Sequence, residues 1–310
     1  MNNIKYFQYI ILICLLCFAL FSQGVSANKQ RKPVEVTIKS FDEFQLVGKL
    51  DIPDYASIQT KAPLVIFLHS INKSSISWED LPEEVKNSLN VATLTLDLRG
   101  HGKSIKNKYN RTRYWQNIFE GDFKSMPDDI MEVLKFIEHD YPEIDNKKIA
   151  IVGASLGASV GTMTASYKPE NIRCLALLSP MVKYKGFDLR LPIVKYGEQP
   201  ALLLVSAKDK YSYDSSIELM KFFQGKKKLE TYPFGGHGED LLKFQPNSKK
   251  LIVQWLKDNF YNGKIPVYVA PLEEQFKKFK SKTVGEYDGK VKDNVRDNAK
   301  NNGDIHGSLH

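Results

Sequence analysis

A short apolar run that ends on two glycines flanking a serine constrains this chain more than any other stretch. Lys148 to Val152 leads into Gly153-Ala154-Ser155-Leu156-Gly157, and small residues that begin a helical pattern follow. This is the G-x-S-x-G pattern between a strand and a helix. A serine at so sharp a turn has a strained backbone, and only glycines two positions to either side leave room for it. The stretch predicts a buried strand, a turn that presents the Ser155 hydroxyl, and a helix.

Strand and helix patterns alternate along most of the chain. In residues 34–38 and 44–52, apolar and polar side chains alternate, which predicts an antiparallel hairpin with one solvent-exposed face. Continuous apolar runs are typical of strands that are buried on both faces of a parallel sheet. Those runs lie at 63–69, 91–96, 174–178 and 201–205, a last strand is expected near 229–232, and helical patterns lie at 78–89, 127–139 and 248–260.

This alternation predicts an α/β fold, with a mostly parallel, doubly wound sheet and helices on both faces. In such folds the ligand site lies at the carboxyl ends of the strands, and Ser155 follows such an end. Residues 181–200 leave room for one short helix near 189–196 but for no large cap domain. Residues 104–122 are the other segment that is long enough to overhang the site, either as an ordinary surface loop or in contact with substrate.

The two ends of the chain differ in character from its middle. Residues 1–27 have one lysine, an apolar stretch and the small residues Val25-Ser26-Ala27, which is typical of a cleaved secretory signal peptide. The apolar stretch falls short of the ~20 residues that a membrane-spanning helix needs, so an uncleaved anchor is the weaker interpretation. We expect residues 28–262 to form the folded domain, and 263–310 to be a charged, largely disordered extension. The predicted location is therefore secreted or periplasmic.

Charge and cysteine usage narrow the classes of partner. The formal net charge is +8, much of it from lysine runs, and no nucleic-acid-binding motif is present. Lysine-rich faces are usually solvated, and the alternative is weak association of the Lys-rich tail with an anionic surface. Only Cys174 would remain in the mature chain, so no intrachain disulfide is expected. Neither a histidine-carboxylate ligand cluster nor a phosphate-cradling loop is evident, and we expect no metal and no organic cofactor.

A serine hydroxyl becomes a good nucleophile only with an adjacent base, and that base needs a carboxylate to orient it. His237 follows the last predicted strand in a glycine-rich loop, and Asp209 comes just past the apolar run 201–205. With Ser155 they give the chain order Ser, Asp, His. Asp214 is the other candidate acid, and we expect it to cap a helix instead. The predicted catalytic residues are therefore Ser155, Asp209 and His237.

With these residues in place, the chain resembles the α/β-hydrolase fold family, in its esterase-like branch near the dienelactone hydrolases. Two further motifs carry the resemblance, Leu-His-Ser at 68–70 and Asp-Leu-Arg-Gly-His-Gly-Lys-Ser at 97–104. The resemblance covers about residues 34–260. It implies that His69 and His101 support loops and do not move protons.

The resemblance also implies an oxyanion hole. One donor would be the backbone amide after the nucleophile, here Leu156, and the second would come from the loop after the third strand, here Ile71. This chain has Ser70 where the family usually has glycine. The second donor therefore lies between Ser70 and Ile71. A backbone amide serves whatever side chain it carries, so the departure leaves the triad intact.

These residues together predict an exported serine hydrolase that acts on a small-molecule ester through an acyl-enzyme. A carboxylesterase for soluble, short-acyl esters is the expected activity, because no large lid would build a deep apolar acyl pocket. A serine peptidase or an acyltransferase of the same fold is an alternative, since the same triad serves each. A non-catalytic binding protein that retains the fold is the alternative from another class.

Overall fold

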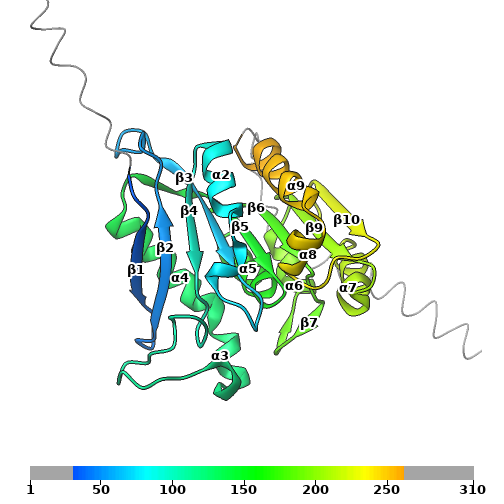
Figure 1. Cartoon of the computed structure of the whole chain (residues 1–310), viewed down its shortest axis with the longest axis horizontal. Coiled ribbons are helices and arrows are strands. Elements are labelled where there is room, and N and C mark those ends of the chain that lie inside the picture. The colour runs from blue at the N-terminus through cyan, green and yellow to red at the C-terminus, as the bar shows by residue number, and fades with distance from the viewer. Residues whose placement is uncertain (1–30, 262–310) are drawn as a thin grey trace, which may run out of the picture.

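The computed structural model of the chain describes residues 31–261, which form an open sheet with helices on both faces (Figure 1). The predicted signal peptide 1–27 and the extension 263–310 lie outside the described residues, so both stay predictions. Within residues 31–261, no helix is both long enough and apolar enough to cross a membrane.

Eight strands form the central sheet, in the order β1-β2-β4-β3-β5-β6-β9-β10. β2 runs antiparallel to both of its neighbours, and the other pairs in this sheet are parallel. A separate antiparallel hairpin consists of β7 and β8. The strands are β1 (Val34–Lys39), β2 (Gln45–Asp51), β3 (Ala62–Leu68), β4 (Ala92–Leu96), β5 (Ile144–Ala154), β6 (Ile172–Leu178), β7 (Lys183–Tyr184), β8 (Phe187–Asp188), β9 (Ala201–Ser206) and β10 (Lys227–Tyr232).

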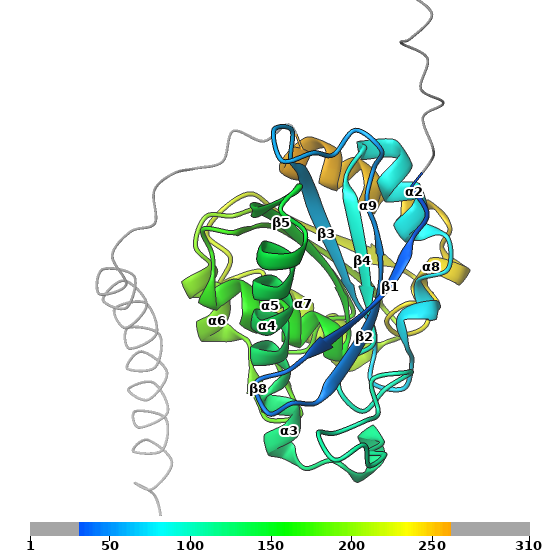
Figure 2. The same ribbon diagram turned by 90° about the vertical axis from the view of Figure 1, so that its left-hand side faces the viewer.

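Helices cover the sheet on both sides. Val133 of α4 and Ile66 of β3 belong to one apolar layer, and Val85 of α2 and Val65 of β3 belong to the other. Figure 2 shows α4 and α5 in front of the sheet, with α2 and α8 to the other side. The helices are α2 (Leu81–Leu89), α3 (Glu120–Lys124), α4 (Met126–Asp140), α5 (Leu156–Tyr167), α6 (Arg190–Tyr196), α7 (Lys210–Leu219), α8 (Asp240–Phe244) and α9 (Asn247–Leu256), with short turns η1 (Ser75–Trp78), η2 (Trp115–Asn117) and η3 (Lys257–Tyr261).

The observed architecture confirms the predicted fold class. Neighbouring residues of β3 lie on opposite faces, and both faces are buried, which explains its unbroken apolar run. In β1 only Val36 and Ile38 are buried, because one face of this edge strand is open to solvent. The first two strands pair as the expected hairpin.

Two short segments meet beyond the carboxyl ends of the parallel strands. A Cβ on Gly186, in the turn of the β7–β8 hairpin, would lie 2.5 Å from Cε of Lys124 in α3, so the hairpin contacts that helix. Figure 1 shows α3 and β7 at the same end of the molecule. Helix α6 is the short helix expected within residues 181–200, and those residues hold no multi-helix cap. The hairpin itself is not predicted, because two-residue strands are too short to show a period.

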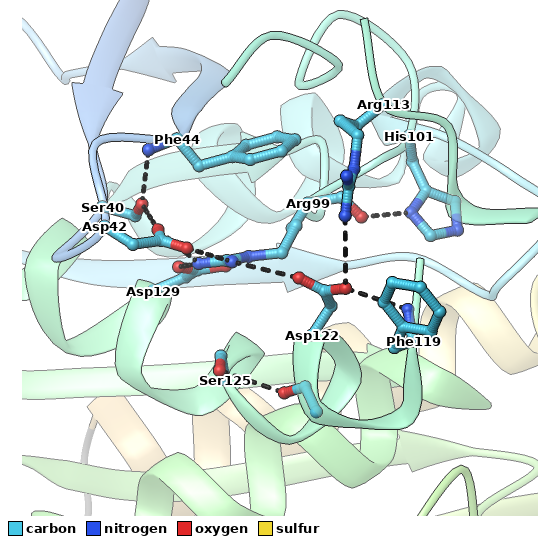
Figure 3. A network of polar contacts seen from close by, with 11 residues as sticks. Ser40, Asp42, Phe44, Arg99, His101, Arg113, Phe119, Asp122, Ser125 and Asp129 are labelled. Carbon is cyan, nitrogen blue, oxygen red and sulfur yellow. Dashed lines mark hydrogen bonds and ion pairs between the residues drawn. The ribbon is translucent and has the colours of Figure 1, made fainter. Parts of the chain in front are cut away.

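A buried arginine ties the loop after β4 to the rest of the fold (Figure 3). Arg99 donates to Asp129 of α4 over 2.9 and 2.5 Å, and to Asp42 in the β1–β2 turn over 2.7 and 2.9 Å. Asp122 of α3 lies 3.8 Å from the same guanidinium. Burial raises the pKa of Asp129 to about 6, and Arg99 offsets this effect only in part. One guanidinium thus joins three segments that are distant in sequence.

Candidate active site

The turn between β5 and α5 holds Ser155 in a strained backbone conformation, with φ of 51° and ψ of −108°. Its two glycines are there for steric reasons. A Cβ on Gly157 would lie 1.9 Å from the carbonyl oxygen of Leu68, and one on Gly153 would lie 2.5 Å from the carbonyl oxygen of Gly157. β3, β5 and α5 therefore meet too closely for any side chain at these positions, and the strand–turn–helix setting of the motif is present.

The structure brings together Ser155, Asp209 and His237, the three residues that the sequence selects. Nε2 of His237 lies 2.7 Å from the Ser155 hydroxyl, and Nδ1 lies 2.7 Å from Oδ2 of Asp209. The three residues follow β5, β9 and β10, so the carboxyl edge of the sheet collects them. Ser155 is buried, whereas the His237 side chain is 42% exposed and open to an incoming ligand.

The environment of Asp209 keeps this carboxyl ionised. Burial raises its pKa, but hydrogen bonds from His237, Ser212 and Ser179 outweigh that effect, and the net pKa lies below the usual value for aspartate. An ionised carboxylate only accepts hydrogen bonds, so Nδ1 of His237 carries the proton that faces it. In a neutral ring Nε2 is then the acceptor for the Ser155 hydroxyl. This is the tautomer that a general base needs.

Ser179 is a site residue that the sequence reasoning missed. It follows β6 with φ of 47°, and its hydroxyl oxygen accepts a hydrogen bond of 3.0 Å from the amide of Gly238. Its hydroxyl also contributes to the lowered pKa of Asp209. Ser179 therefore joins the carboxylate to the His237 loop. The available signal was its position, directly after a buried strand run and at the same sheet edge as Ser155.

The expectation that Asp214 caps a helix is wrong. Helix α7 begins at Lys210, and Asp209 occupies the N-cap position, so Asp214 lies inside the helix. There its carboxylate pairs with the Lys210 ammonium over 2.6 Å, on an exposed surface. The serines after Asp214 resemble a helix start, which placed the expected boundary too late.

The loop after β3 leaves one backbone amide available beside Ser155. The N–H of Ser70 donates to Oε1 of Glu239 over 2.9 Å, so this amide is occupied. Among residues 31–261, neither the N–H of Ile71 nor that of Leu156 has a protein acceptor. Of the two alternatives for the second oxyanion donor, the geometry favours Ile71.

His69 and His101 bind backbone groups. Nε2 of His69 accepts the amide of Leu98 over 2.9 Å, and Nδ1 donates to the carbonyl of Ser70 over 2.7 Å. Burial lowers the pKa of His69 to about 4. His101 contacts the carbonyl oxygens of Arg99 and Ile71. Both rings therefore shape the loop that carries Ile71, which agrees with the supporting role implied by the resemblance.

No metal centre is evident in the described part of the chain. Residues 31–261 contain no group of three or more His, Cys, Asp or Glu side chains that could hold a metal ion. Cys174 is buried, and burial raises its thiol pKa to about 12, so it is not a reactive thiolate.

Comparison with known proteins gives matches of two kinds. A family model for the alpha/beta hydrolase fold matches residues 63–196, which include the Ser155 turn. Ethanol acetyltransferase 1 of Wickerhamomyces ciferrii is 25% identical over 154 residues, which is 50% of this chain and 34% of that protein. The chain thus spans about a third of the length of this curated relative.

Solved structures share the fold at low sequence identity. Dienelactone hydrolase from Anabaena variabilis superposes with a TM-score of 0.56 at 18% identity, covering 74% of this chain and 99% of that one. Est1E from Butyrivibrio proteoclasticus, solved with ferulic acid bound, gives 0.57 at 19% identity, covering 72% and 98%. Acetyl xylan esterase 1 from Thermoanaerobacterium gives 0.57 at 15% identity, covering 73% and 84%. The strand order, the family-model match and these superpositions together show that the chain has the α/β-hydrolase fold.

Proposed function

We propose that this chain is a serine hydrolase, and that a carboxylesterase activity on short-acyl soluble esters is its function. The observation that carries the proposal is the hydrogen-bonded series from Ser155 through His237 to Asp209 at the carboxyl edge of the sheet. All three side chains are chemically competent for their roles, and their spacing is that of a working nucleophile, base and acid.

The proposed reaction has two halves. As the Ser155 oxygen attacks the ester carbonyl, Nε2 of His237 takes the hydroxyl proton and then returns it to the leaving alcohol. Water then loses a proton to the same nitrogen and attacks the acyl-enzyme, which releases the acid and restores the Ser155 hydroxyl. Asp209 stabilises the imidazolium that forms in each half, and its lowered pKa supports this role.

The proposed oxyanion hole consists of the amides of Leu156 and Ile71. Leu156 is the first residue of α5, so its N–H lies at the positive end of the helix dipole. The charge that develops on the carbonyl oxygen would be met by donors already in place, which is usually the largest single contribution to such catalysis.

The preference for short acyl groups follows from the segments near the site. Residues 181–200 contribute the β7–β8 hairpin and α6 in place of a multi-helix lid, and α3 lies against the hairpin turn. Such short elements do not build the long apolar tunnel that a fatty acyl chain requires. A series of p-nitrophenyl esters should therefore give a higher kcat/KM for acetate or butyrate than for palmitate. A maximum at palmitate would refute the preference.

A fluorophosphonate probe tests the proposed nucleophile. The native chain should be labelled, and Ser155→Ala and heat-denatured chain should not be. Ser155→Ala should also lose ester hydrolysis by on the order of 10⁴-fold or more. Equal labelling of the native and Ser155→Ala chains would exclude the mechanism. Equal hydrolysis by wild type and His237→Ala would favour a non-catalytic binding protein.

Acyl transfer is a second candidate activity, because the curated relative named above is an ethanol acetyltransferase. The two activities differ in what attacks the acyl-enzyme, an alcohol or water. With p-nitrophenyl acetate as donor, the yield of ethyl acetate at increasing ethanol concentrations separates them. If the fraction of acetyl groups transferred to ethanol exceeds the molar ratio of ethanol to water, acyl transfer is favoured over hydrolysis. The triad would serve a peptidase equally well, and an aminoacyl p-nitroanilide substrate tests that activity.

Two proposals concern segments outside the described residues. We propose export through a signal peptide at 1–27, with a secreted or periplasmic location, which N-terminal sequencing of the mature protein tests. We also propose weak attachment of the lysine-rich tail to anionic surfaces. Cosedimentation with anionic vesicles should then weaken with salt.

A further inference from the structure

A carboxylate is buried beside the proposed oxyanion loop. Glu239 is 1% exposed and lies two residues after His237. Its Oε1 accepts the amide of Ser70 over 2.9 Å, and its Oε2 accepts the hydroxyl of the same serine. The hydroxyl of Ser77 lies 2.9 Å from Oε1. Neither the triad nor the oxyanion donors account for this group.

These neighbours suit an ionised carboxylate. Ser70 offers two donors, and an ionised carboxylate accepts hydrogen bonds without donating any. No lysine, arginine or histidine of the described residues forms an ion pair with Glu239, although the nearby Lys73 pairs with Asp240 over 2.9 Å. Burying a carboxylate costs free energy unless hydrogen bonds or a nearby positive charge compensate, so the bonds to Ser70 and the charge of Lys73 together stabilise Glu239.

The peptide planes of the oxyanion loop show what those bonds fix. In the plane between His69 and Ser70, the carbonyl accepts the amide of Gly157 over 3.1 Å and the amide donates to Glu239. In the next plane, the Ser70 carbonyl accepts Nδ1 of His69 over 2.7 Å and the amide of Lys73 over 3.1 Å. A trans peptide directs its N–H opposite to its C=O. The amide left over is that of Ile71, and Glu239 fixes the plane directly before it.

The same residue also belongs to the loop of the proposed base. Gly238 has φ of 59°, and a Cβ there would lie 2.2 Å from the Ser70 hydroxyl oxygen, so the two loops touch. Glu239 therefore links the loop that carries Ile71 to the loop that carries His237. An ester carbonyl on Ser155 has to meet both groups in one geometry.

We propose that Glu239 is a positioning residue of the proposed hydrolase, holding the His69–Ser70 peptide against the His237 loop so that the Ile71 amide, in the peptide that follows, points at the developing oxyanion. This inference rests on the proposed function. It also explains why a serine occupies position 70, since only a side chain with a donor there meets the second carboxylate oxygen.

The test compares Glu239→Asp, Glu239→Ala and Glu239→Gln in the full chain, with p-nitrophenyl acetate as substrate. An oxyanion donor acts in the transition state, so its misplacement lowers kcat and spares KM. We expect Asp and Ala to lower kcat by about 10- to 100-fold with KM within about twofold of wild type. Glutamine keeps an oxygen for the Ser70 amide, and should hold kcat within about fivefold. Inhibition by phenylboronic acid, which mimics the tetrahedral intermediate, should weaken in parallel with kcat.

Asp240→Asn is the matched control. It removes the adjacent, more exposed carboxylate, whose ion pair with Lys73 joins the same two loops. Its kcat should stay within about twofold of wild type, because a partly exposed pair contributes little. An equal loss of kcat in Asp240→Asn and Glu239→Asp would overturn the proposal, because any contact between the two loops would then have the same effect as Glu239.

The outcomes separate the two levels of inference. A wild type that neither hydrolyses esters nor reacts with a fluorophosphonate refutes the proposed function, and the role of Glu239 falls with it. An active wild type with an unchanged kcat in folded Glu239→Asp and Glu239→Ala refutes the positioning role alone. If the alanine variant does not fold, the shorter aspartate decides: wild-type kcat overturns the proposal, and a loss in kcat at constant KM supports it.

Discussion

Replacing Arg99 by methionine tests how far one buried cation stabilises the fold. Arg99 and Asp129 each have a side chain that is 2% exposed, and they share two hydrogen bonds. Methionine removes the positive charge and leaves the Asp129 carboxylate buried without a cation. Breaking such a pair from one side typically costs about 3–5 kcal/mol. Asp42 is 41% exposed, so its bonds to Arg99 add at most about 1 kcal/mol.

The double variant Arg99→Met/Asp129→Leu sharpens this prediction. It removes both members of the buried pair, and the new side chains can pack against Phe44, whose ring lies 5.1 Å from the Arg99 guanidinium. Replacing a buried ion pair by apolar residues is often close to neutral. The double variant should therefore recover about 2 kcal/mol or more of the loss in Arg99→Met.

Urea unfolding followed by circular dichroism measures the free energies of unfolding of wild type and both variants. Asp42→Asn is the matched control, because it removes the more exposed carboxylate of the same network, and it should cost about 1 kcal/mol or less. A loss below about 1 kcal/mol in Arg99→Met would refute the reasoning, since the pair would then behave as a surface pair. So would a double variant that is no more stable than Arg99→Met alone.

Three further predictions follow from single residues. The folded-state pKa of His69, about 4, lies below its ordinary value of 6.5, so the unfolded chain binds the proton more tightly than the folded chain does. The free energy of unfolding should therefore fall as the pH is lowered from 6.5 to 4. Over this range, the difference in free energy of unfolding between wild type and His69→Gln, measured with urea, should shrink by up to roughly 3 kcal/mol. A pH-independent difference would contradict this. Gly157→Ala would place Cβ 1.9 Å from the Leu68 carbonyl oxygen and should cost more than about 3 kcal/mol or abolish soluble expression, whereas Gly121→Ala, with open space around its Cβ, should not. Ser179→Ala removes a hydrogen bond to Asp209, the proposed catalytic acid, and should lower kcat roughly tenfold. Steady-state kinetics with p-nitrophenyl acetate would measure this loss. An unchanged kcat would mean that Asp209 does not need the hydrogen bond from Ser179.

The parts of the fold that follow from local patterns could be predicted from the sequence. The two-sided burial of β3 needs an unbroken apolar run, and the Ser155 turn needs two glycines, so both leave a local signature. Asp209 and His237 could be selected because each lies in the loop that follows a strand, and parallel strands end at a common edge.

The parts that depend on distant partners could not be predicted. The choice between Ser70 and Ile71 as proposed donor depends on Glu239, which lies 169 residues further along the chain and bonds to the Ser70 amide. The residues next to Ser70 in the sequence give no indication of this hydrogen-bond partner. The start of α7 shows the opposite failure, because the serines after Asp214 resemble a cap although the chain has already entered the helix.

An open sheet has two edge strands, and in the described part of the chain these are β1 and β10, each of which pairs with a single strand. The backbone donors and acceptors on such strands are a template on which another copy can add a strand. Lys227 and Lys228 are exposed on β10, and Glu35 and Lys39 are exposed on β1. A second copy that approached either edge strand would have to desolvate these charges. Charged side chains such as Lys39, Lys227 and Lys228 on edge strands disfavour the pairing of strands between molecules.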